Sequence, residues 1–217
     1  SFRKFYRKKF KKKSSIIVYA EKEKIQNLLN YDSVNKLLLQ KNINAPRLLS
    51  ENFNQNLIEI DDLGTKTILD ILKKKNTNKL KIYKKILVIL IKLQKIKIKK
   101  IKNFKKKFYK IPIYSNKLIF NEANLFLDWY IPKIINKNKK LKIKKDLKKI
   151  IISLIKKIQL PNTIFVHRDF HVSNLMIKKN KISIIDSQDA VYGNIAYDLA
   201  SLIDDVRLKT SKNIKEM

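Results

Sequence analysis

The chain has 217 residues and a formal net charge of +33, from 51 Lys and Arg against 18 Asp and Glu. It contains no Cys, which excludes a disulfide framework and a thiolate metal site. Only five of the basic residues are Arg, the residue preferred for bidentate phosphate recognition, and the Lys are spread among many Ile and Asn. We therefore interpret the charge as a coding bias and expect no specific nucleic-acid partner.

The apolar runs are too short to cross a bilayer, and lysine borders the longest of them, such as residues 86–91 and 150–152. The first residues contain no apolar signal segment. We therefore expect a cytoplasmic protein with no membrane partner. The chain begins at Ser1 rather than Met and ends in the polar segment 212–217, so we also expect a fragment of a longer protein.

The first third of the chain has the pattern of a small sheet with one helix. Residues 1–10 alternate aromatic and basic side chains and 15–20 form a β-branched run, which together predict a hairpin. Apolar residues at helical spacing predict a helix over 31–41. A strand over 57–60 follows and ends at the turn 61–64.

From residue 65 onward the apolar period changes to that of an amphipathic helix. It predicts helices over residues 67–72, 80–93, 118–135 and 147–158. The lysine-rich pieces 95–107 and 136–149 are interpreted as solvated helix faces and connectors rather than nucleic-acid patches. This part of the chain is therefore expected to be mainly helical.

A polar loop lies among three short apolar runs, which are residues 164–166, 175–177 and 182–185. A His-x-Asp-x-x-x-x-Asn spacing puts Asp169 and Asn174 at opposite ends of this loop, and a hairpin would bring Asp186 back beside them. Phosphoryl transfer requires a carboxylate to orient the attacking hydroxyl, and oxygen ligands to hold Mg²⁺ against nucleotide phosphates. The three residues therefore predict a phosphoryl-transfer site.

Six segments carry a resemblance to a known family. They are SFRKFYR at 1–7, DDLG at 61–64, LFLDWY at 125–130, HRDFH at 167–171 with Asn174, IDSQDAVYG at 185–193 and YDLASL at 197–202. On these segments the chain resembles the aminoglycoside phosphotransferase-like kinases. Within them it most resembles the bacterial kinases that phosphorylate the anomeric hydroxyl of N-acetylmuramate or N-acetylglucosamine.

The resemblance implies a two-lobed protein-kinase-like fold of the α+β class. A small antiparallel sheet would form a nucleotide-binding lobe over residues 1–64, and a mainly helical catalytic lobe would cover 65–217. The start of the first lobe and the C-terminal helices of the second are expected to be missing from this sequence. The implied cofactors are ATP and Mg²⁺, and the implied partner is a small-molecule acceptor.

The resemblance also implies roles for residues of the polar loop. Asp169 would be the catalytic base, and Asn174 and Asp186 would be the Mg²⁺ ligands. Asp198 and His167 would support the loop, because a His at a junction between strand and loop is usually a hydrogen-bonded structural residue.

The nucleotide would be held from the sheet lobe. The backbone of Asp61, Asp62 and Leu63 would form the hinge that binds adenine. For the basic residue that neutralises the phosphates, Lys22 is the first candidate and Arg3 the second.

The acceptor is expected to contact residues from the helical lobe. The candidates are Glu122, Asp128, Tyr130, His171 and Asp189. Trp129 is predicted to lie in the core, because a lone Trp in an amphipathic helix usually packs inward.

Two features depart from the family pattern. Ser187 follows the proposed metal ligand where the family has an aromatic residue, and no Gly precedes Gly64, although the phosphate-covering turn is usually preceded by small residues that include Gly.

An amino sugar is the first interpretation of the acceptor, and an aminoglycoside, choline or an amino alcohol is the alternative. A cationic acceptor would need an acidic pocket, and the acidic residues form no obvious cluster in the sequence. A non-catalytic, basic nucleic-acid-associated protein is a second alternative, against which Asp169, Asn174 and Asp186 argue together. A protein kinase is disfavoured, because Ser187 and Gln188 stand where that class has Phe-Gly.

Overall fold

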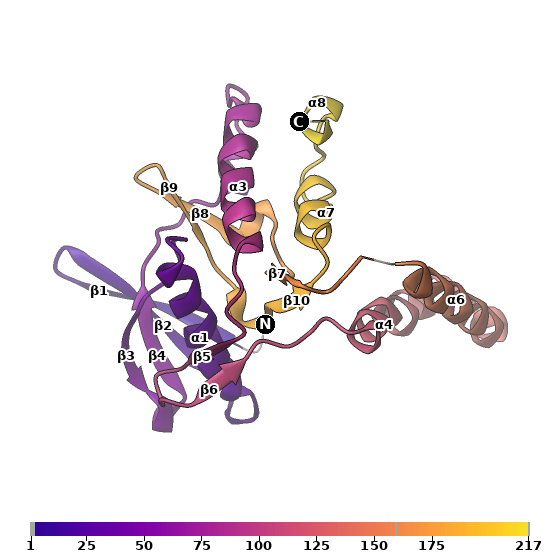
Figure 1. Cartoon of the computed structure of the whole chain (residues 1–217), viewed down its shortest axis with the longest axis horizontal. Helices are drawn as coiled ribbons and strands as arrows, with labels where there is room; N and C mark the ends of the chain where they lie inside the picture. Colours follow the sequence, from indigo (N-terminus) through magenta and orange to yellow (C-terminus); the bar gives the residue numbers. More distant parts are fainter. Residues whose placement is uncertain (1–2, 159, 217) are drawn as a thin grey trace.

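The computed structural model describes residues 3–158 and 160–216. An antiparallel sheet lies at one end, mainly helical structure lies beside it, and a helical hairpin stands apart from both (Figure 1). The architecture is α+β, as predicted. The lobe boundary between residues 64 and 65 stays a prediction.

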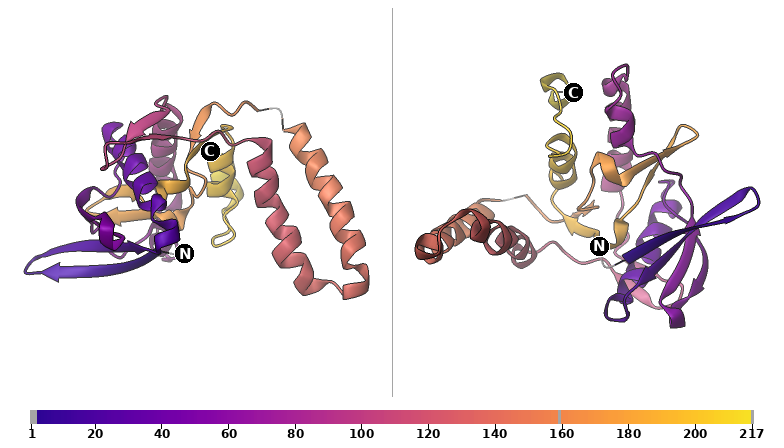
Figure 2. Two further views of the ribbon diagram at one scale, coloured as in Figure 1. Left: turned by 90° about the horizontal axis from the view of Figure 1, so that it is seen from below. Right: turned by 180° about the vertical axis from the view of Figure 1, so that it is seen from behind.

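The sheet has four strands in the order β1-β2-β4-β3. They are β1 (Arg3–Phe10), β2 (Lys13–Ala20), β3 (Leu48–Asn52) and β4 (Leu57–Asp61). The predicted hairpin and the predicted strand at 57–60 are confirmed. β3 was not predicted, because its sequence is short and mostly exposed, without alternation of apolar and polar side chains. The β1–β2 hairpin extends beyond the rest of the sheet (Figure 2).

Helix α1 (Gln26–Gln40) packs against the sheet. It begins before the predicted start at residue 31, because Leu28 is already buried in the core that the helix shares with β2 and β4. Tyr31 on α1, Val18 on β2 and Ile58 on β4 belong to the same core. Each large apolar side chain buried in this way contributes roughly 1.5–3 kcal/mol, so this core fixes the sheet against α1.

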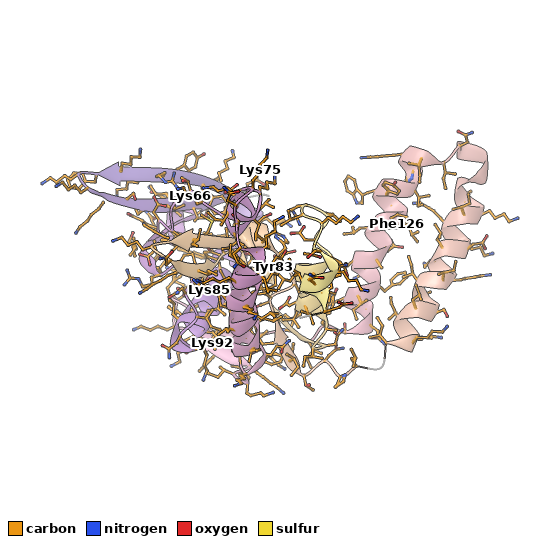
Figure 3. The ribbon with its side chains drawn as sticks, turned by 90° about the horizontal axis from the view of Figure 1, so that it is seen from above. Lys66, Lys75, Tyr83, Lys85, Lys92 and Phe126 are labelled. Carbon is orange, nitrogen blue, oxygen red and sulfur yellow. The ribbon has the colours of Figure 1, made fainter. Side chains whose placement is uncertain are left out.

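A larger core surrounds the polar loop of residues 167–174. It joins side chains of α1, α2 (Ile68–Leu72), α3 (Lys79–Gln94) and α7 (Tyr197–Ile203). Phe165 and Phe170, on either side of the proposed base, are fully buried in it. On α3, Tyr83 is buried whereas Lys85 and Lys92 are exposed (Figure 3), so lysine covers the solvated face of this helix. The polar loop is therefore packed against a buried apolar core.

The short elements complete this part of the fold. They are β5 (Lys100–Lys102), β6 (Phe108–Lys110), β7 (Ile164–Val166), β8 (Leu175–Lys178), β9 (Lys181–Ile184), β10 (Val191–Gly193), α8 (Lys212–Lys215) and the 3-10 turns η1 (Lys22–Lys24), η2 (Phe53–Gln55), η4 (Val172–Asn174) and η5 (Ser187–Asp189). The three predicted apolar runs are β7, β8 and β9. The segment 95–107, interpreted as connector and helix face, instead contains β5. Among the described residues, no helix is long and apolar enough to span a membrane.

The helical hairpin consists of α4 (Asn116–Leu125), the π-helical turn η3 (Phe126–Tyr130), α5 (Ile131–Ile134) and α6 (Lys137–Lys157). It projects away from the body of the molecule (Figures 1 and 2). The helix predicted to start at 147 starts ten residues earlier, since lysine is a good helix former. The prediction that Trp129 is a core residue was wrong. Its neighbours Leu127 and Ile131 are buried, whereas the Trp129 side chain, which is 70% exposed, points to solvent.

Candidate active site

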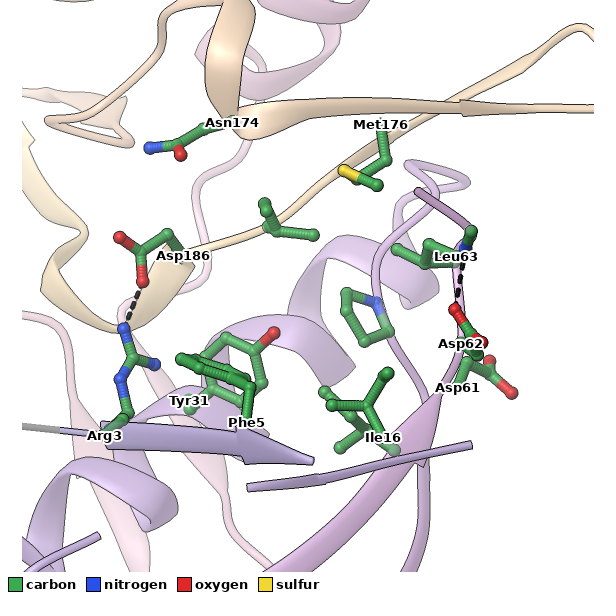
Figure 4. A pocket seen from close by; sticks show the side chains of 14 residues that line it. Arg3, Phe5, Ile16, Tyr31, Asp61, Asp62, Leu63, Asn174, Met176 and Asp186 are labelled. Atoms are coloured by element: carbon green, nitrogen blue, oxygen red, sulfur yellow. Dashed lines mark hydrogen bonds and ion pairs between the residues drawn. The ribbon is translucent and has the colours of Figure 1, made fainter. Parts of the chain in front are cut away.

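A pocket of about 320 Å³ lies between the sheet and the β8–β9 hairpin (Figure 4). Arg3 and Phe5 of β1 line it on one side, and the turn 61–64 after β4 lines another. Asn174 and Asp186 line the side formed by the polar loop. The volume is that of a small-molecule site. The lining is mostly apolar, with Arg3, Asn174 and Asp186 on one side and Asp61 and Asp62 on the other (Figure 4).

The β8–β9 hairpin brings Asn174 and Asp186 together. Leu175 pairs with Ile184, and the N–H of Ile185 donates to the carbonyl of Asn174 at 3.0 Å. This register places Asp186 beside Asn174 (Figure 4), in a left-handed backbone conformation with φ 66°. The two side chains offer a carboxylate and an amide oxygen, which are the hard ligands that Mg²⁺ prefers.

Asp169 lies next to this pair. Its backbone carbonyl accepts a hydrogen bond from Nδ2 of Asn174 at 3.1 Å, which leaves the amide oxygen of Asn174 available as a ligand. Burial, followed by the negative charge of Asp186, raises the pKa of Asp169 above its ordinary value. The structure thus brings together the three residues that the spacing singled out.

Two buried residues lie beneath the loop. The Asp198 carboxylate, 2% exposed, accepts the N–H of His167 at 2.7 Å and the N–H of Arg168 at 3.1 Å. Burial raises the pKa of Asp198 to about 7 against the effect of these two donors. The His167 ring is fully buried, and burial lowers its pKa to about 4, so the ring is neutral near pH 7. These contacts suit the supporting roles that were predicted, and the roles themselves stay predictions.

Arg168 was not among the predicted site residues. Its backbone is left-handed, with φ 74°, and its guanidinium forms an ion pair with Glu122 of α4 and donates to the Asp189 carbonyl at 3.1 Å. The Tyr114 hydroxyl also donates to Glu122. Glu122 therefore lies at the loop, where its charge is matched by Arg168. Its role as an acceptor contact stays a prediction.

The two candidates for the phosphate-neutralising cation lie in different places. Arg3 is the only basic side chain that lines the pocket within the described chain. It forms an ion pair with Asp186 and donates to Oε1 of Gln188 at 2.9 Å. Lys22 is exposed in η1 and is not among the lining residues, because β2 ends before it and the chain turns away. The geometry favours Arg3 over Lys22.

Of the remaining acceptor candidates, His171 and Asp189 lie at the loop. Nε2 of His171 is 3.4 Å from Nδ2 of Asn174, and burial lowers its pKa. The contacts of Asp128 and Tyr130 are within the helical hairpin instead: Asp128 pairs with Lys144 at 3.0 Å, and Tyr130 stacks on Phe126. The structure therefore does not bring Asp128 and Tyr130 to the loop.

Asp169 lies beside the Asn174 amide and the Asp186 carboxylate, next to a pocket between a small sheet and the β8–β9 hairpin, which is the architecture of a kinase-like phosphotransferase. The model of the Phosphotransferase enzyme family matches residues 98–215, more than half of the chain, and the chain belongs to this family. The family resemblance drawn from the sequence is confirmed.

Two named relatives are similar to nearly the whole chain. The N-acetylmuramate/N-acetylglucosamine kinase of Neisseria meningitidis serogroup B is 27% identical over 206 residues, which are 94% of this chain and 58% of that protein. The enzyme of the same name from Pseudomonas aeruginosa is 26% identical over 205 residues, which are 94% of this chain and 57% of that protein. The chain therefore spans little more than half the length of these relatives.

Solved structures support the fold. ADP-bound aminoglycoside phosphotransferase APH(2'')-Ib aligns with a TM-score of 0.63 and 13% identity, covering 98% of this chain and 74% of that one. Choline kinase LicA from Streptococcus pneumoniae aligns with a TM-score of 0.58 and 14% identity, covering 98% of this chain and 68% of that one. The predicted protein-kinase-like fold class is thereby confirmed.

Proposed function

We propose that this protein is an ATP-dependent kinase that transfers the γ-phosphoryl group to a hydroxyl of a small molecule, and that the acceptor is the anomeric hydroxyl of an amino sugar. One observation carries the reaction class: Asn174 and Asp186 line the pocket, and Asp169 lies next to them, with its backbone carbonyl bonded to Asn174. The similarity to two N-acetylmuramate/N-acetylglucosamine kinases over 94% of the chain supports the acceptor class.

The residues present fit a magnesium ion. Asn174 and Asp186 supply two oxygen ligands, and Mg²⁺ is usually held by one or two protein side chains together with substrate phosphates and water. No group of three or more His, Cys, Asp or Glu side chains that could hold a metal occurs in residues 3–158 and 160–216. The ion would neutralise the phosphates and orient them for in-line displacement.

The chain's own groups would act as follows. The carboxylate of Asp169 orients the acceptor hydroxyl and takes its proton as the oxygen attacks the γ-phosphorus and the bond from phosphorus to the ADP oxygen breaks. A raised pKa suits this role, because a base works best when its pKa approaches the working pH. Arg3 faces the phosphates, and the backbone of the turn 61–64 holds the base of the nucleotide.

The surroundings of Asp169 favour a neutral or anionic acceptor over a cationic one. The charge of Glu122 is matched by Arg168, and Asp189 remains as an exposed carboxylate beside the loop. One exposed carboxylate makes this surface less acidic than a site for a cationic aminoglycoside or choline would need to be. A panel of amino sugars, aminoglycosides and choline, tested with ATP and Mg²⁺ by release of ADP, discriminates these classes. Release of ADP with choline or an aminoglycoside, but with no amino sugar, would contradict the amino-sugar proposal.

Variants separate the roles. Asp169→Asn should lower turnover by roughly 10²- to 10⁴-fold and leave Mg·ATP affinity nearly intact, because a positioned base acts on the chemical step. Asp186→Ala should lose both turnover and the Mg²⁺ dependence of nucleotide binding. Asp204→Asn is a control, since Asp204 is an exposed carboxylate at the end of α7 that pairs only with Lys215 among described residues. Near-normal turnover of Asp169→Asn would contradict the mechanism.

A further inference from the structure

Arg7 connects the β1–β2 hairpin to the turn after β4. It lies on β1 opposite Ile16 of β2, on the same strand as Arg3 and Phe5. Its Nε donates to Oδ2 of Asp62 at 2.8 Å, and its Nη2 lies 3.2 Å from Oδ1 of the same carboxylate. Nη2 also donates to the Gly64 carbonyl at 3.0 Å. One guanidinium thus binds two residues of the turn that lines the pocket.

Asp62 receives further hydrogen bonds. The Gly64 N–H donates to its Oδ1 at 2.8 Å, closing a turn in which Gly64 has φ 92°. Lys178, at the end of β8, donates to the Asp62 backbone carbonyl at 2.7 Å. Burial acts to raise the pKa of Asp62, but hydrogen bonds from Gly64, Ser14 and Arg7 outweigh it and lower that pKa below its ordinary value. The buried Asp62 carboxylate is therefore ionised, and it stabilises the turn by accepting hydrogen bonds from Arg7 and from the Gly64 N–H.

The arrangement leaves part of the turn open to a ligand. The Asp62 carboxylate and the Gly64 carbonyl are engaged by Arg7, whereas the backbone of Leu63 makes no hydrogen bond to any residue in 3–158 or 160–216. Leu63 lines the pocket. Arg7 thus fixes the conformation in which Leu63 presents its backbone groups.

We propose that Arg7 is a positioning residue for the nucleotide. By holding Asp62 and Gly64 it sets the turn that contacts the base, and through β1 it keeps this turn in register with Arg3 at the phosphate end of the pocket. The proposal rests on the proposed function of the pocket. A planar guanidinium matches a carboxylate through two parallel bonds, and a lysine ammonium at the same position would supply charge without this geometry.

The test compares four variants with the wild type: Arg7→Gln, Arg7→Lys, Asp62→Asn and the double variant Arg7→Gln/Asp62→Asn. Lys8→Gln is the matched control, because Lys8 is the next residue on the same strand, is about half exposed, and pairs instead with Glu59 at 3.3 Å. Affinity for a fluorescent ADP analogue is measured by titration without acceptor. Hydrogen exchange of residues 57–66 is followed without ligand.

Arg7→Gln should weaken nucleotide binding roughly 10-fold, the factor that corresponds to about 1.4 kcal/mol. Arg7→Lys should restore only part of this loss, and Lys8→Gln should bind as the wild type does. The double variant should lose less affinity than the sum of the two single losses, since Arg7 acts in part through Asp62. The Gly64 amide should exchange faster in Arg7→Gln than in the wild type or Lys8→Gln.

Three results would overturn the proposal: wild-type affinity in Arg7→Gln, full rescue by Arg7→Lys, or losses that add in the double variant. If the wild type binds no adenine nucleotide, the proposed function fails. Exchange at Gly64 then still decides whether Arg7 holds the turn, because unchanged exchange in Arg7→Gln contradicts the coupling whatever the ligand is. If Arg7→Gln no longer melts cooperatively, hydrogen exchange at Gly64 is compared between Arg7→Lys and the wild type instead.

Discussion

Replacing Ser187 by Ala tests how the segment after Asp186 is held in place. The Ser187 hydroxyl donates to Oδ1 of Asn35 on α1 at 2.7 Å, and both side chains are buried. Deleting the hydroxyl leaves a buried amide oxygen without this donor, which costs about 1–2 kcal/mol. Ser187→Ala should therefore lower the free energy of unfolding by that amount.

Urea unfolding followed by circular dichroism measures the change. Ser33→Ala is the control on the same helix: the Ser33 hydroxyl is also buried but bonds the Leu29 carbonyl one turn earlier, so its loss should cost less than about 0.5 kcal/mol. A double-mutant cycle of Ser187→Ala with Asn35→Leu isolates the pair. Asn35 also bonds the Tyr31 side chain, and this bond is lost in both proteins that carry Asn35→Leu, so its energy cancels from the coupling energy. A coupling energy below about 0.3 kcal/mol would refute the reasoning.

Three further predictions concern the loop and its neighbours. The pKa of His167 in the folded protein, about 4, lies below its ordinary value of 6.5. The contribution of neutral His167 to the free energy of unfolding is therefore present above pH 6.5 and is lost as the pH falls through 4. The difference in unfolding free energy between wild type and His167→Gln should shrink by about 3 kcal/mol over that range, and a pH-independent difference would contradict it. Glu122→Gln breaks the pair with Arg168 and should raise KM for the acceptor but not for ATP, and steady-state kinetics showing a parallel rise in both would refute this. Thr67→Ala removes the N-cap of α2 and should destabilise by about 1 kcal/mol in urea, unlike Thr65→Ala, and equal effects would speak against the cap.

Local patterns were sufficient for much of the fold. Alternation predicted the hairpin of β1 and β2, and the 3.6-residue period predicted α3 at nearly its observed bounds. The start of α6 was missed because its first half has few apolar residues, and helix propensity carries it there. The three-residue strands β5 and β6 were not predicted, because both contain lysine and have little apolar pattern, whereas the equally short but wholly apolar β7 was predicted.

The candidate site was predictable where residues share one loop or hairpin, as Asp169, Asn174 and Asp186 do. Contacts between distant segments were not. Arg7 and Asp62 are 55 residues apart, and Glu122 and Arg168 are 46 apart, so only the packing of strands and helices reveals these pairs. In a chain with 51 basic residues, sequence alone could not separate Arg3 from Lys22.

The exposed position of Trp129 gives the molecule a built-in optical probe. It is the only tryptophan of the chain, it lies on the helical hairpin, and its side chain is 70% exposed. Indole emission moves to shorter wavelength when water is removed from around the ring. Intrinsic fluorescence therefore monitors the solvation of this one surface: whatever covers the hairpin will shift the spectrum, and a ligand confined to the pocket beside β1 will leave it unchanged.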